Sequence, residues 1–308
     1  MSVLYVGEPE RGRKWAAIFR DRAPDLPIRV WPDIDDPKAI RYLVAWKLPP
    51  ALVGELPNLE AVFSVGAGVD QLDLSAIPER LPLARMIEPS IVAGVVTYVT
   101  MAVLALHRNL IDYIAQQREG RWQAQPMVLP AARRVGLMGR GLLGKQVLAS
   151  LARFGFPLAS WARTPASLDG IDCFAGPEDL ALFLARSDIL ICLVPLTPAT
   201  RGILDARTFA ALPRGAGLVN AGRGGHLVEA DLLPALDSGQ LSAAILDVFE
   251  PEPLPAGHAF WRHPRILVTP HVGATTQAET AAEVLLANIR RHQRGETLQG
   301  LIDRSRGY

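Results

Sequence analysis

Short apolar runs alternate with more polar, helix-like stretches along the first part of the chain. Turn-forming residues separate the runs, which are VLYVG (3–7), IRVW (28–31), YLVAW (42–46), LEAVFSVG (59–66) and PLARM (82–86). Strands that alternate with helices are typical of a parallel sheet. The pattern therefore predicts a first α/β domain.

A second series of apolar runs follows a long apolar helix, which we predict from about residue 90 to 118. A strand predicted at 133–138 leads directly into GRGLLG (139–144). The later runs are PLASWA (157–162), ILICLV (189–194), GLVN (217–220), AAILDV (243–248) and ILVTP (266–270). Such runs suit the buried central strands of a doubly wound sheet.

The two series predict an α/β protein with two Rossmann-like or flavodoxin-like doubly wound parallel-sheet domains and a cleft between them. We expect the NAD(P)-binding Rossmann domain to span 96–274. The segment 275–295 has helical periodicity, and we assign it to the first domain because the second sheet is already complete. The substrate-binding, flavodoxin-like domain is then 1–95 plus 275–308.

Charge and composition narrow the classes of partner. The 308 residues include 32 basic and 31 acidic side chains, a net charge of +1, so there is no electrostatic footprint for nucleic acid or an anionic membrane. With Cys173 and Cys192 as the only cysteines, neither a disulfide framework nor a metal site is expected. The N-terminus lacks the pattern of a secretory signal, which favours the cytoplasm.

The stretch Ile91–Leu106 is free of charged residues, and Thr97, Tyr98 and Thr100 interrupt it. It falls short of the roughly 20 apolar residues that span a bilayer. We therefore expect a buried helix at a domain or subunit contact and no membrane span.

GRGLLG has the GxGxxG spacing between a predicted strand and an amphipathic helix. Gly139 would permit the tight turn, Gly141 the approach of a pyrophosphate, and Gly144 close packing of helix on strand. Free N–H groups at the helix start would meet the phosphate charge. Glycines often serve turns alone, but the strand and helix around this loop favour dinucleotide binding.

The next predicted strand ends at Ala162, Arg163 and Thr164, where an NAD-preferring protein would carry an Asp or Glu for the ribose hydroxyls. Arg163 and Thr164 could instead bind the 2′-phosphate of NADP. Arg140 in the glycine loop is a weaker candidate for the same phosphate. The alternative for Arg163 is an ordinary solvated side chain. NADPH is therefore the preferred cofactor, with NAD possible.

Three residues downstream of this loop carry candidate chemistry: Arg223 after GLVN, Glu252 in a Pro-Glu-Pro turn, and His271 after ILVTP. A cation can hold a carboxylate, an imidazole can transfer a proton, and a carboxylate beside it favours the protonated form. Taken singly they could be a surface ion pair, a solvated acid and a structural histidine. The other histidines, at 107, 226, 258, 263 and 292, are expected to be structural or exposed.

The segments GRGLLG, LVNAGRGG, LDVFEPEPLP and VTPHVGA, in this order and spacing, resemble the D-2-hydroxyacid dehydrogenase family, and SVGAGVD (64–70) resembles its substrate loop. Within the family, the chain is most similar to the NADPH-dependent glyoxylate/hydroxypyruvate reductase branch. That similarity is carried by AVFSVGAGVD, IDYIAQQREGRWQ, FAGPEDLALFL, LPALDSG and the terminal IDRSRGY.

The resemblance implies that Arg223 binds the substrate carboxylate and carbonyl, that His271 is the acid/base, and that Glu252 hydrogen-bonds His271. It implies that Asp247 holds the nicotinamide carboxamide and that a pocket aromatic stands at Trp46, which could equally be a core residue. The loop amides implied to face the carboxylate are those of Val65, Gly66, Ala67 and Gly68. Further cofactor contacts are expected from Leu142, Leu143, Val194, Pro195, Thr200, Ala221 and Gly222.

The chain departs from the family in PSIVAGVVTYV, where Val92 and Thr97 stand at positions that are commonly glycine-rich or acidic. The pocket shape, and the choice among glyoxylate, hydroxypyruvate and larger 2-oxo acids, stay open. Two alternative functions are a non-catalytic dinucleotide-sensing scaffold of the same fold and a dehydrogenase for a bulkier 2-hydroxy acid. The family also implies a homodimer through the long apolar helix and the arm near Trp122.

Overall fold

The structure is a computed structural model that describes residues 1–304, so the last four residues of IDRSRGY lie outside the described part. The chain forms two compact units. Unit 1 contains residues 1–92 and the segment from Thr275 onward, and unit 2 contains residues 93–274. The first boundary between the two units falls after Val92, whereas the sequence predicts it after residue 95.

Unit 1 is built on a five-stranded parallel sheet in the order β2-β1-β3-β4-β5. The strands are β1 (Ser2–Val6), β2 (Ile28–Val30), β3 (Ile40–Ala45), β4 (Ala61–Ser64) and β5 (Leu83–Ala84). This order is that of flavodoxin-like sheets. The central strands β1, β3 and β4 are buried along almost their whole length, which explains their continuous apolar sequence.

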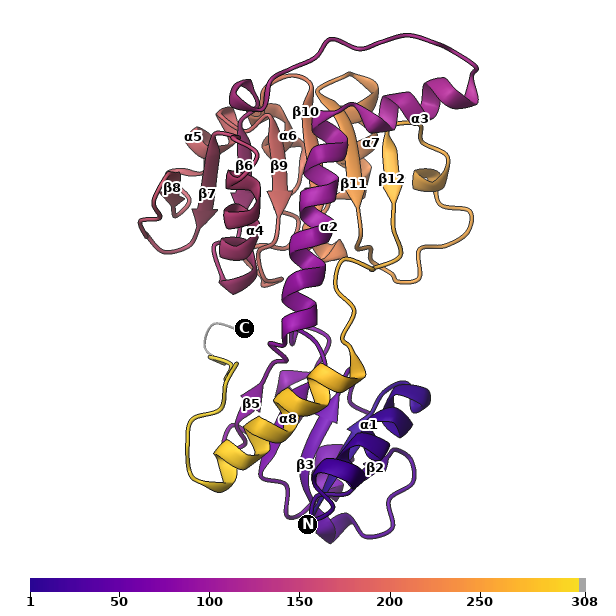
Figure 1. Ribbon diagram of the computed structural model, residues 1–308, viewed down its shortest axis with the longest axis vertical. Coiled ribbons are helices and arrows are strands. Elements are labelled where there is room, and N and C mark those ends of the chain that lie inside the picture. The colour runs from indigo at the N-terminus through magenta and orange to yellow at the C-terminus, as the bar shows by residue number, and fades with distance from the viewer. Residues whose placement is uncertain (305–308) are drawn as a thin grey trace. The chain divides into compact units, whose positions relative to one another are not determined.

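Helices α1 (Pro9–Arg22) and α8 (Ala278–Gln293) pack side by side on one face of this sheet (Figure 1). They bury Trp15 and Phe19 from α1 and Leu285 and Ile289 from α8. The other face is covered by connecting turns rather than by long helices. Its hydrophobic cluster joins strand residues such as Leu43 to turn residues such as those of 52–56 and 72–81.

Unit 2 carries a seven-stranded parallel sheet in the order β12-β11-β10-β9-β6-β7-β8. The strands are β6 (Val135–Met138), β7 (Leu158–Ala162), β8 (Ile171–Ala175), β9 (Ile189–Cys192), β10 (Ala216–Asn220), β11 (Leu241–Leu246) and β12 (Ile266–Val268). The strands from β6 to β11 follow the 3-2-1-4-5-6 order of dinucleotide-binding sheets, and β12 extends it. The order reverses between β6 and β9, where such sheets bind ligands at the carboxyl ends of their strands.

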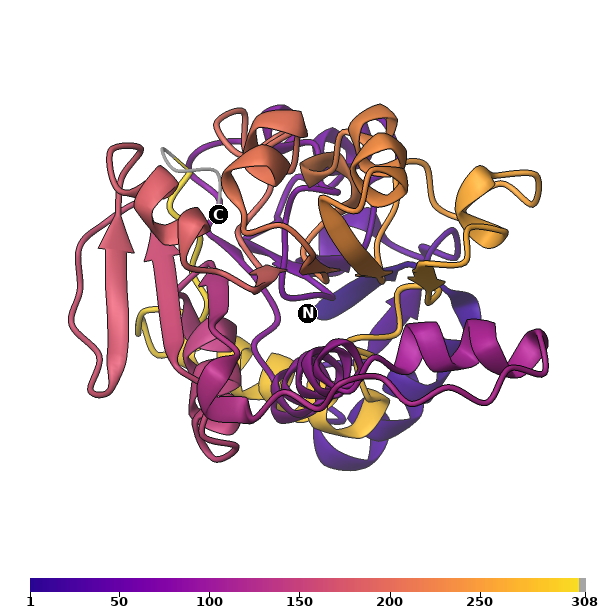
Figure 2. The ribbon, with the colours of Figure 1, turned by 90° about the horizontal axis from the view of Figure 1, so that it is seen from above.

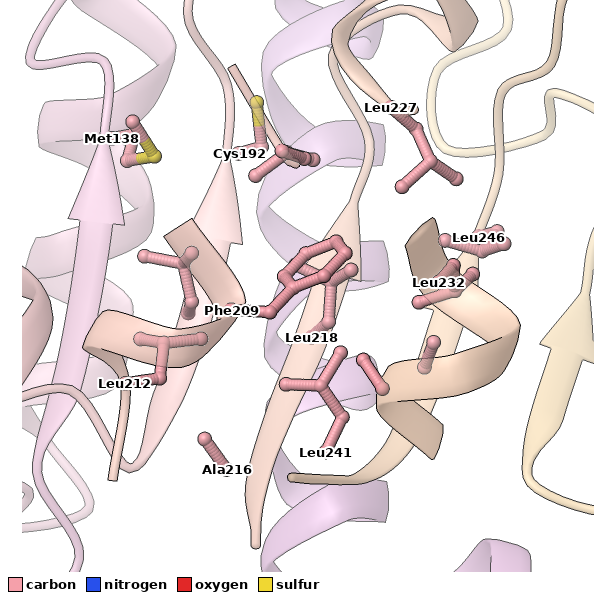
Figure 3. Close-up of a cluster of buried hydrophobic side chains, with 14 of the residues drawn as sticks. Met138, Cys192, Phe209, Leu212, Ala216, Leu218, Leu227, Leu232, Leu241 and Leu246 are labelled. Atoms are coloured by element: carbon pink, nitrogen blue, oxygen red, sulfur yellow. The ribbon is translucent and has the colours of Figure 1, made fainter. Parts of the chain in front are cut away.

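Helices cover both faces of the unit 2 sheet, with α2 and α4 on one side and α6 and α7 on the other (Figure 2). The helices of this unit are α2 (Pro89–His107), which begins in unit 1, α3 (Leu110–Arg118), α4 (Leu142–Ala152), α5 (Leu180–Ala185), α6 (Ala206–Ala211) and α7 (Glu229–Asp237). Successive residues of β9 alternate between the faces, as a strand requires. Leu190 and Cys192 join the cluster in Figure 3, where Phe209 lies beside Leu218, and Ile189 and Ile191 join the opposite cluster.

Helix α2 is long and apolar enough to cross a membrane by length and composition alone. In the structure its side chains pack on the sheet of unit 2, where Val99, Ala102 and Val103 are fully buried. Core packing therefore accounts for the apolar residues on the buried face of the helix.

Two local features differ from the sequence predictions, although the predicted α/β fold class is confirmed. The single helix expected from 90 to 118 is divided at Asn109, which adopts a left-handed conformation (φ 54°) that Asn tolerates better than most residues. The sequence pattern does not predict strand β8. It is an edge strand with no fully buried residue, so it lacks the apolar signal of its neighbours.

Candidate active site

The loop between β6 and α4 has the backbone that a close approach of phosphate requires. Gly139 has φ 106°, and a Cβ there would lie 2.6 Å from the Leu193 carbonyl. A Cβ on Gly144 would lie 1.9 Å from the Gly139 oxygen, so glycine lets α4 pack onto the loop. A Cβ on Gly141 would meet no heavy atom of the described residues within 4 Å. These three positions match the separate roles of the GxGxxG glycines.

The residues expected beside this loop occupy its two flanks. Leu142 is exposed in the first turn of α4, whereas Leu143 packs against the hydrophobic cluster beneath it. Val194 and Pro195 follow β9, and the Val194 nitrogen is one of the atoms that a Cβ at Gly139 would strike. The Thr200 hydroxyl donates to the Pro195 carbonyl at 2.7 Å, so it holds the turn next to the glycine loop.

Arg140 does not point outward as a direct phosphate ligand, which corrects the sequence interpretation. Its guanidinium is buried and donates to the Thr164 carbonyl at 2.6 Å, the Ser160 hydroxyl at 3.1 Å and the Phe174 carbonyl at 3.3 Å. The polar groups at the ends of β7 and β8 draw the side chain inward because a buried cation must be hydrogen-bonded. Arg140 therefore ties the glycine loop to the segment that carries Arg163.

Arg163 and Thr164 lie directly after β7, and both are exposed. Since β6 pairs with β7 and Met138 faces Trp161 in the register, the two residues emerge next to the glycine loop. The position where an acid would bind ribose hydroxyls is thus occupied by a cation and a hydroxyl.

Arg223 follows β10 in a loop whose backbone is held by two buried polar side chains that the sequence analysis did not assign to the site. The Asn220 amide donates to the Arg223 carbonyl at 3.0 Å, and the Arg223 amide donates to Nδ1 of His226 at 3.0 Å. The Arg223 guanidinium also donates to the Gly222 carbonyl at 2.8 Å, next to Ala221. The backbone before this half-buried side chain is therefore firmly placed.

Glu252 and His271 form the hydrogen-bonded pair that the resemblance implies. Oε2 of Glu252 lies 2.8 Å from Nδ1 of His271, and Oε1 accepts from the Phe249 amide at 2.9 Å. Burial alone would raise the pKa of Glu252. The hydrogen bonds from His271 and Phe249, together with the charges of His271 and Arg223, instead hold its pKa below the ordinary value. Glu252 is thus ionised at neutral pH.

Gly224 brings the Arg223 loop against the loop that carries Glu252. A Cβ on Gly224 would lie 2.0 Å from the carbonyl carbon of Phe249, a distance that no side chain can occupy. The backbones of 223–225 and 249–250 therefore lie in direct contact. This close approach explains how residues from two separate strand ends reach one site.

Asp247 and His271 are joined through their backbones as well. His271 has φ 52°, and its amide donates to the carbonyls of Asp247 and Thr269. The buried Asp247 carboxylate accepts from the Val272 amide at 2.9 Å and the Gly273 amide at 2.7 Å. The turn that carries His271 is therefore wrapped around this carboxylate.

Unit 1 supplies the predicted substrate loop. A Cβ on Gly66 would lie 3.0 Å from the ring of Trp46, so the half-exposed indole lies over the loop. The Val65 amide donates to Ala45 and the Gly66 amide to the Ser64 hydroxyl. The expectation that all four amides face a ligand is therefore wrong for Val65, whose amide continues the strand ladder. Among residues 1–304, the amides of Ala67 and Gly68 have no acceptor.

Comparisons with known proteins bear on the same features. Residues 100–273 match the model of the D-isomer specific 2-hydroxyacid dehydrogenase, NAD binding domain. Two curated relatives are both named glyoxylate/hydroxypyruvate reductase A. The one from Yersinia enterocolitica is 37% identical and the one from Serratia proteamaculans 38% identical, and each alignment covers 100% of both chains.

Solved structures of the same kind are closely similar. A D-isomer specific 2-hydroxyacid dehydrogenase from Xanthobacter autotrophicus in complex with NADPH and MES is 38% identical, with a TM-score of 0.94 over 100% of this chain and 99% of that one. An NADPH-dependent glyoxylate/hydroxypyruvate reductase from Sinorhizobium meliloti, solved with NADP and sulfate, is 35% identical. Its TM-score is 0.92 over 100% of both chains.

Proposed function

The chain belongs to the D-isomer specific 2-hydroxyacid dehydrogenase family, and we propose that it uses NADPH to reduce a small 2-oxo acid, glyoxylate to glycolate or hydroxypyruvate to D-glycerate. The observation that carries the proposal is the 2.8 Å pair of Glu252 and His271 in the unit that also holds Arg223 and the glycine loop. The relatives named for this activity support the choice of small 2-oxo acids.

The preference for NADPH rests on the end of β7. Arg163 and Thr164 present a guanidinium and a hydroxyl where a carboxylate would repel a 2′-phosphate. The glycine loop fits a dinucleotide because Gly141 leaves its outer side open. The similar structures that contain NADPH or NADP support the same coenzyme.

Each residue of the trio has a defined part in the proposed reaction. The reduced nicotinamide, when bound, supplies a hydride for C2 of the oxo acid. Arg223 holds the substrate carboxylate and carbonyl and stabilises negative charge on the carbonyl oxygen. His271 donates a proton to that oxygen from Nε2, because Nδ1 is engaged with Glu252. The ionised Glu252 orients the imidazole and favours its protonated form.

In unit 1, the amides of Ala67 and Gly68 are suited to bind a carboxylate, because a carboxylate accepts hydrogen bonds from backbone amides. Trp46 would supply an apolar surface for the rest of a small substrate. In this proposal Asp247 receives the nicotinamide carboxamide while it also holds the turn at 269–273.

We further propose that the protein is a homodimer in the cytoplasm. The arm after α3 exposes Trp122, Met127 and Leu129, whose exposed fractions are 102%, 78% and 62%. Apolar side chains gathered on one segment in this way mark interaction surfaces. A homodimer with twofold symmetry is the commonest assembly that buries such a surface.

The test is to follow the oxidation of NADPH and NADH with glyoxylate, hydroxypyruvate and a series of bulkier 2-oxo acids. We expect turnover with the two small acids and a lower KM for NADPH than for NADH. Tight NADPH binding without turnover of any acid would overturn the proposal and favour a dinucleotide-sensing scaffold. Turnover of the bulky acids alone would favour a different dehydrogenase.

A further inference from the structure

A line of three side chains runs from helix α2 to the turn that carries His271. The Tyr98 hydroxyl lies 2.6 Å from the Thr269 hydroxyl, and the Thr269 hydroxyl lies 2.6 Å from Oδ1 of Asp247. The three residues come from α2, from the end of β12 and from the end of β11, and all belong to unit 2. Tyr98 and Asp247 are buried, and Thr269 is partly buried.

The direction of the hydrogen bonds along this line is fixed by the groups at its end. Both oxygens of Asp247 accept from backbone amides, one from Val272 and the other from Gly273. The carboxylate is therefore an acceptor, and the single Thr269 hydrogen points to it. The Thr269 oxygen is left to accept from Tyr98. Burial raises the pKa of Tyr98 to about 12, so its phenol keeps the hydrogen that it donates.

The Asp247 carboxylate in turn holds the backbone on either side of His271. Successive amides that converge on one anion form a nest, a conformation that includes a left-handed residue. His271 is that residue here, with φ 52°. Tyr98 also packs against the turn directly, since a Cβ on Gly273 would lie 3.3 Å from the Tyr98 ring and 2.7 Å from Oδ2 of Asp247.

We propose that Tyr98 and Thr269 are positioning residues for His271 and act through Asp247. They orient the carboxylate, which holds the turn at 269–273 and keeps His271 in the left-handed conformation from which its imidazole reaches Glu252. The proposal rests on the reductase function proposed above and assigns it two residues outside the trio.

Two substitutions at Thr269 separate hydrogen bonding from packing. Thr269→Val keeps the shape and loses the hydroxyl, whereas Thr269→Ser keeps the hydroxyl and loses a methyl group. We expect Thr269→Val to lower kcat about tenfold, as for the loss of one hydrogen bond to a charged group, and Thr269→Ser to stay close to the parent. Greater loss in Thr269→Ser than in Thr269→Val would show that Thr269 only packs and would overturn the proposal.

Tyr98→Phe tests the far end of the line. It should lower kcat severalfold in the parent but have no further effect in a Thr269→Val background, because a double-mutant cycle exposes residues that act through one another. Tyr42→Phe is the matched control, since it removes another buried tyrosine hydroxyl, which lies 3.2 Å from His292 in unit 1. Additive effects of the two changes would contradict a shared line.

Hydrogen exchange gives a readout that needs no turnover. The Val272 and Gly273 amides should exchange faster in Thr269→Val than in the parent and Thr269→Ser, while a peptide from α8 should not change. Unchanged exchange in Thr269→Val would overturn the proposal even if the enzyme were active. Failure of the parent to reduce any 2-oxo acid would instead overturn the proposed function, and the exchange result would still show whether the line holds the turn.

Discussion

The proposed catalytic end and the proposed coenzyme-selecting end of unit 2 are held in different ways. Glu252 and His271 come from separate loops, and each is bonded to the other and to a further backbone group. Arg163 and Thr164 stand together on one exposed segment, tied down at the Thr164 carbonyl by Arg140. Proton transfer needs fixed geometry, whereas attraction to a phosphate works over a range of positions. In the proposed mechanism, the residues that transfer the proton are thus the ones held by more hydrogen bonds.

The largest effect should come from breaking the catalytic end at His271. His271→Asn removes the acid while retaining a residue type that tolerates φ 52°. We expect kcat to fall by about 10² to 10⁴, the usual contribution of general acid catalysis, and the coenzyme to bind as before. Steady-state kinetics and NADPH fluorescence titration measure both quantities. A parental rate would remove His271 from the mechanism.

Glu252→Gln should have the next largest effect, lowering kcat/KM about ten- to a hundredfold through the loss of a charge-assisted hydrogen bond. The pH profile gives a second measurement. Because the pKa of Glu252 lies below its ordinary value, the parent keeps its carboxylate down to acidic pH and loses it as pH falls through that lowered pKa. The acidic limb assigned to Glu252 should disappear in the variant, and its persistence would mean that another group causes it.

The same lowered pKa links Glu252 to stability. A group whose pKa is lower in the folded state stabilises the fold above its unfolded pKa, and this contribution disappears as pH falls through the folded pKa. The melting temperature of the parent should therefore fall toward acidic pH more steeply than that of Glu252→Gln. If the melting temperatures of the two proteins fell equally with pH, the Glu252 carboxylate would not stabilise the folded state through this pair.

The coenzyme-selecting end should respond selectively. Arg163→Ala is expected to raise KM for NADPH about tenfold, the cost of a hydrogen bond to a charged group, and to leave KM for NADH unchanged. Arg153→Ala is the matched control, since it removes an exposed arginine at the other end of α4. An equal rise in KM for both coenzymes would show that Arg163 does not bind the 2′-phosphate.

The smallest kinetic effect is expected from Arg140→Met, which keeps much of the side-chain length but removes the donors to Thr164, Ser160 and Phe174. Loosening of the segment after β7 should raise KM for NADPH a few-fold, in proportion to ordinary hydrogen bonds, with kcat retained. A fall in kcat comparable to that of Glu252→Gln would show that the two ends are not held independently.

The sequence predicts the parts of the molecule whose signals are local. Buried strands, the glycines of the phosphate loop and the strand ends that carry Arg223 and His271 could all be located from apolar runs and turn residues. The edge strand β8 could not, because its half-exposed residues carry no such run. Neither could the division at Asn109, since one residue in a left-handed conformation leaves little trace in an apolar pattern.

Side-chain direction is the second thing that the sequence leaves undetermined. Arg140 occupies a loop expected to bind phosphate, but its guanidinium turns toward Ser160 and Phe174, 20 and 34 positions away. Tyr98 meets Thr269 across 171 positions. Asn220 and His226 lie close to Arg223 in sequence, yet their hydrogen bonds to its backbone depend on how the chain turns after β10. Such contacts arise only once the strands are assembled.

The left-handed turn at position 271 also bears on how this protein could evolve. Histidine codons become asparagine or aspartate codons by one base change. Asparagine and aspartate are among the non-glycine residues that adopt a positive φ most readily, as position 271 requires. A lineage could therefore lose proton transfer in one step while the turn around Asp247 and the glycine loop persist. Under the mechanism proposed above, the fold thus stands one point mutation away from a cofactor-binding protein with greatly reduced turnover.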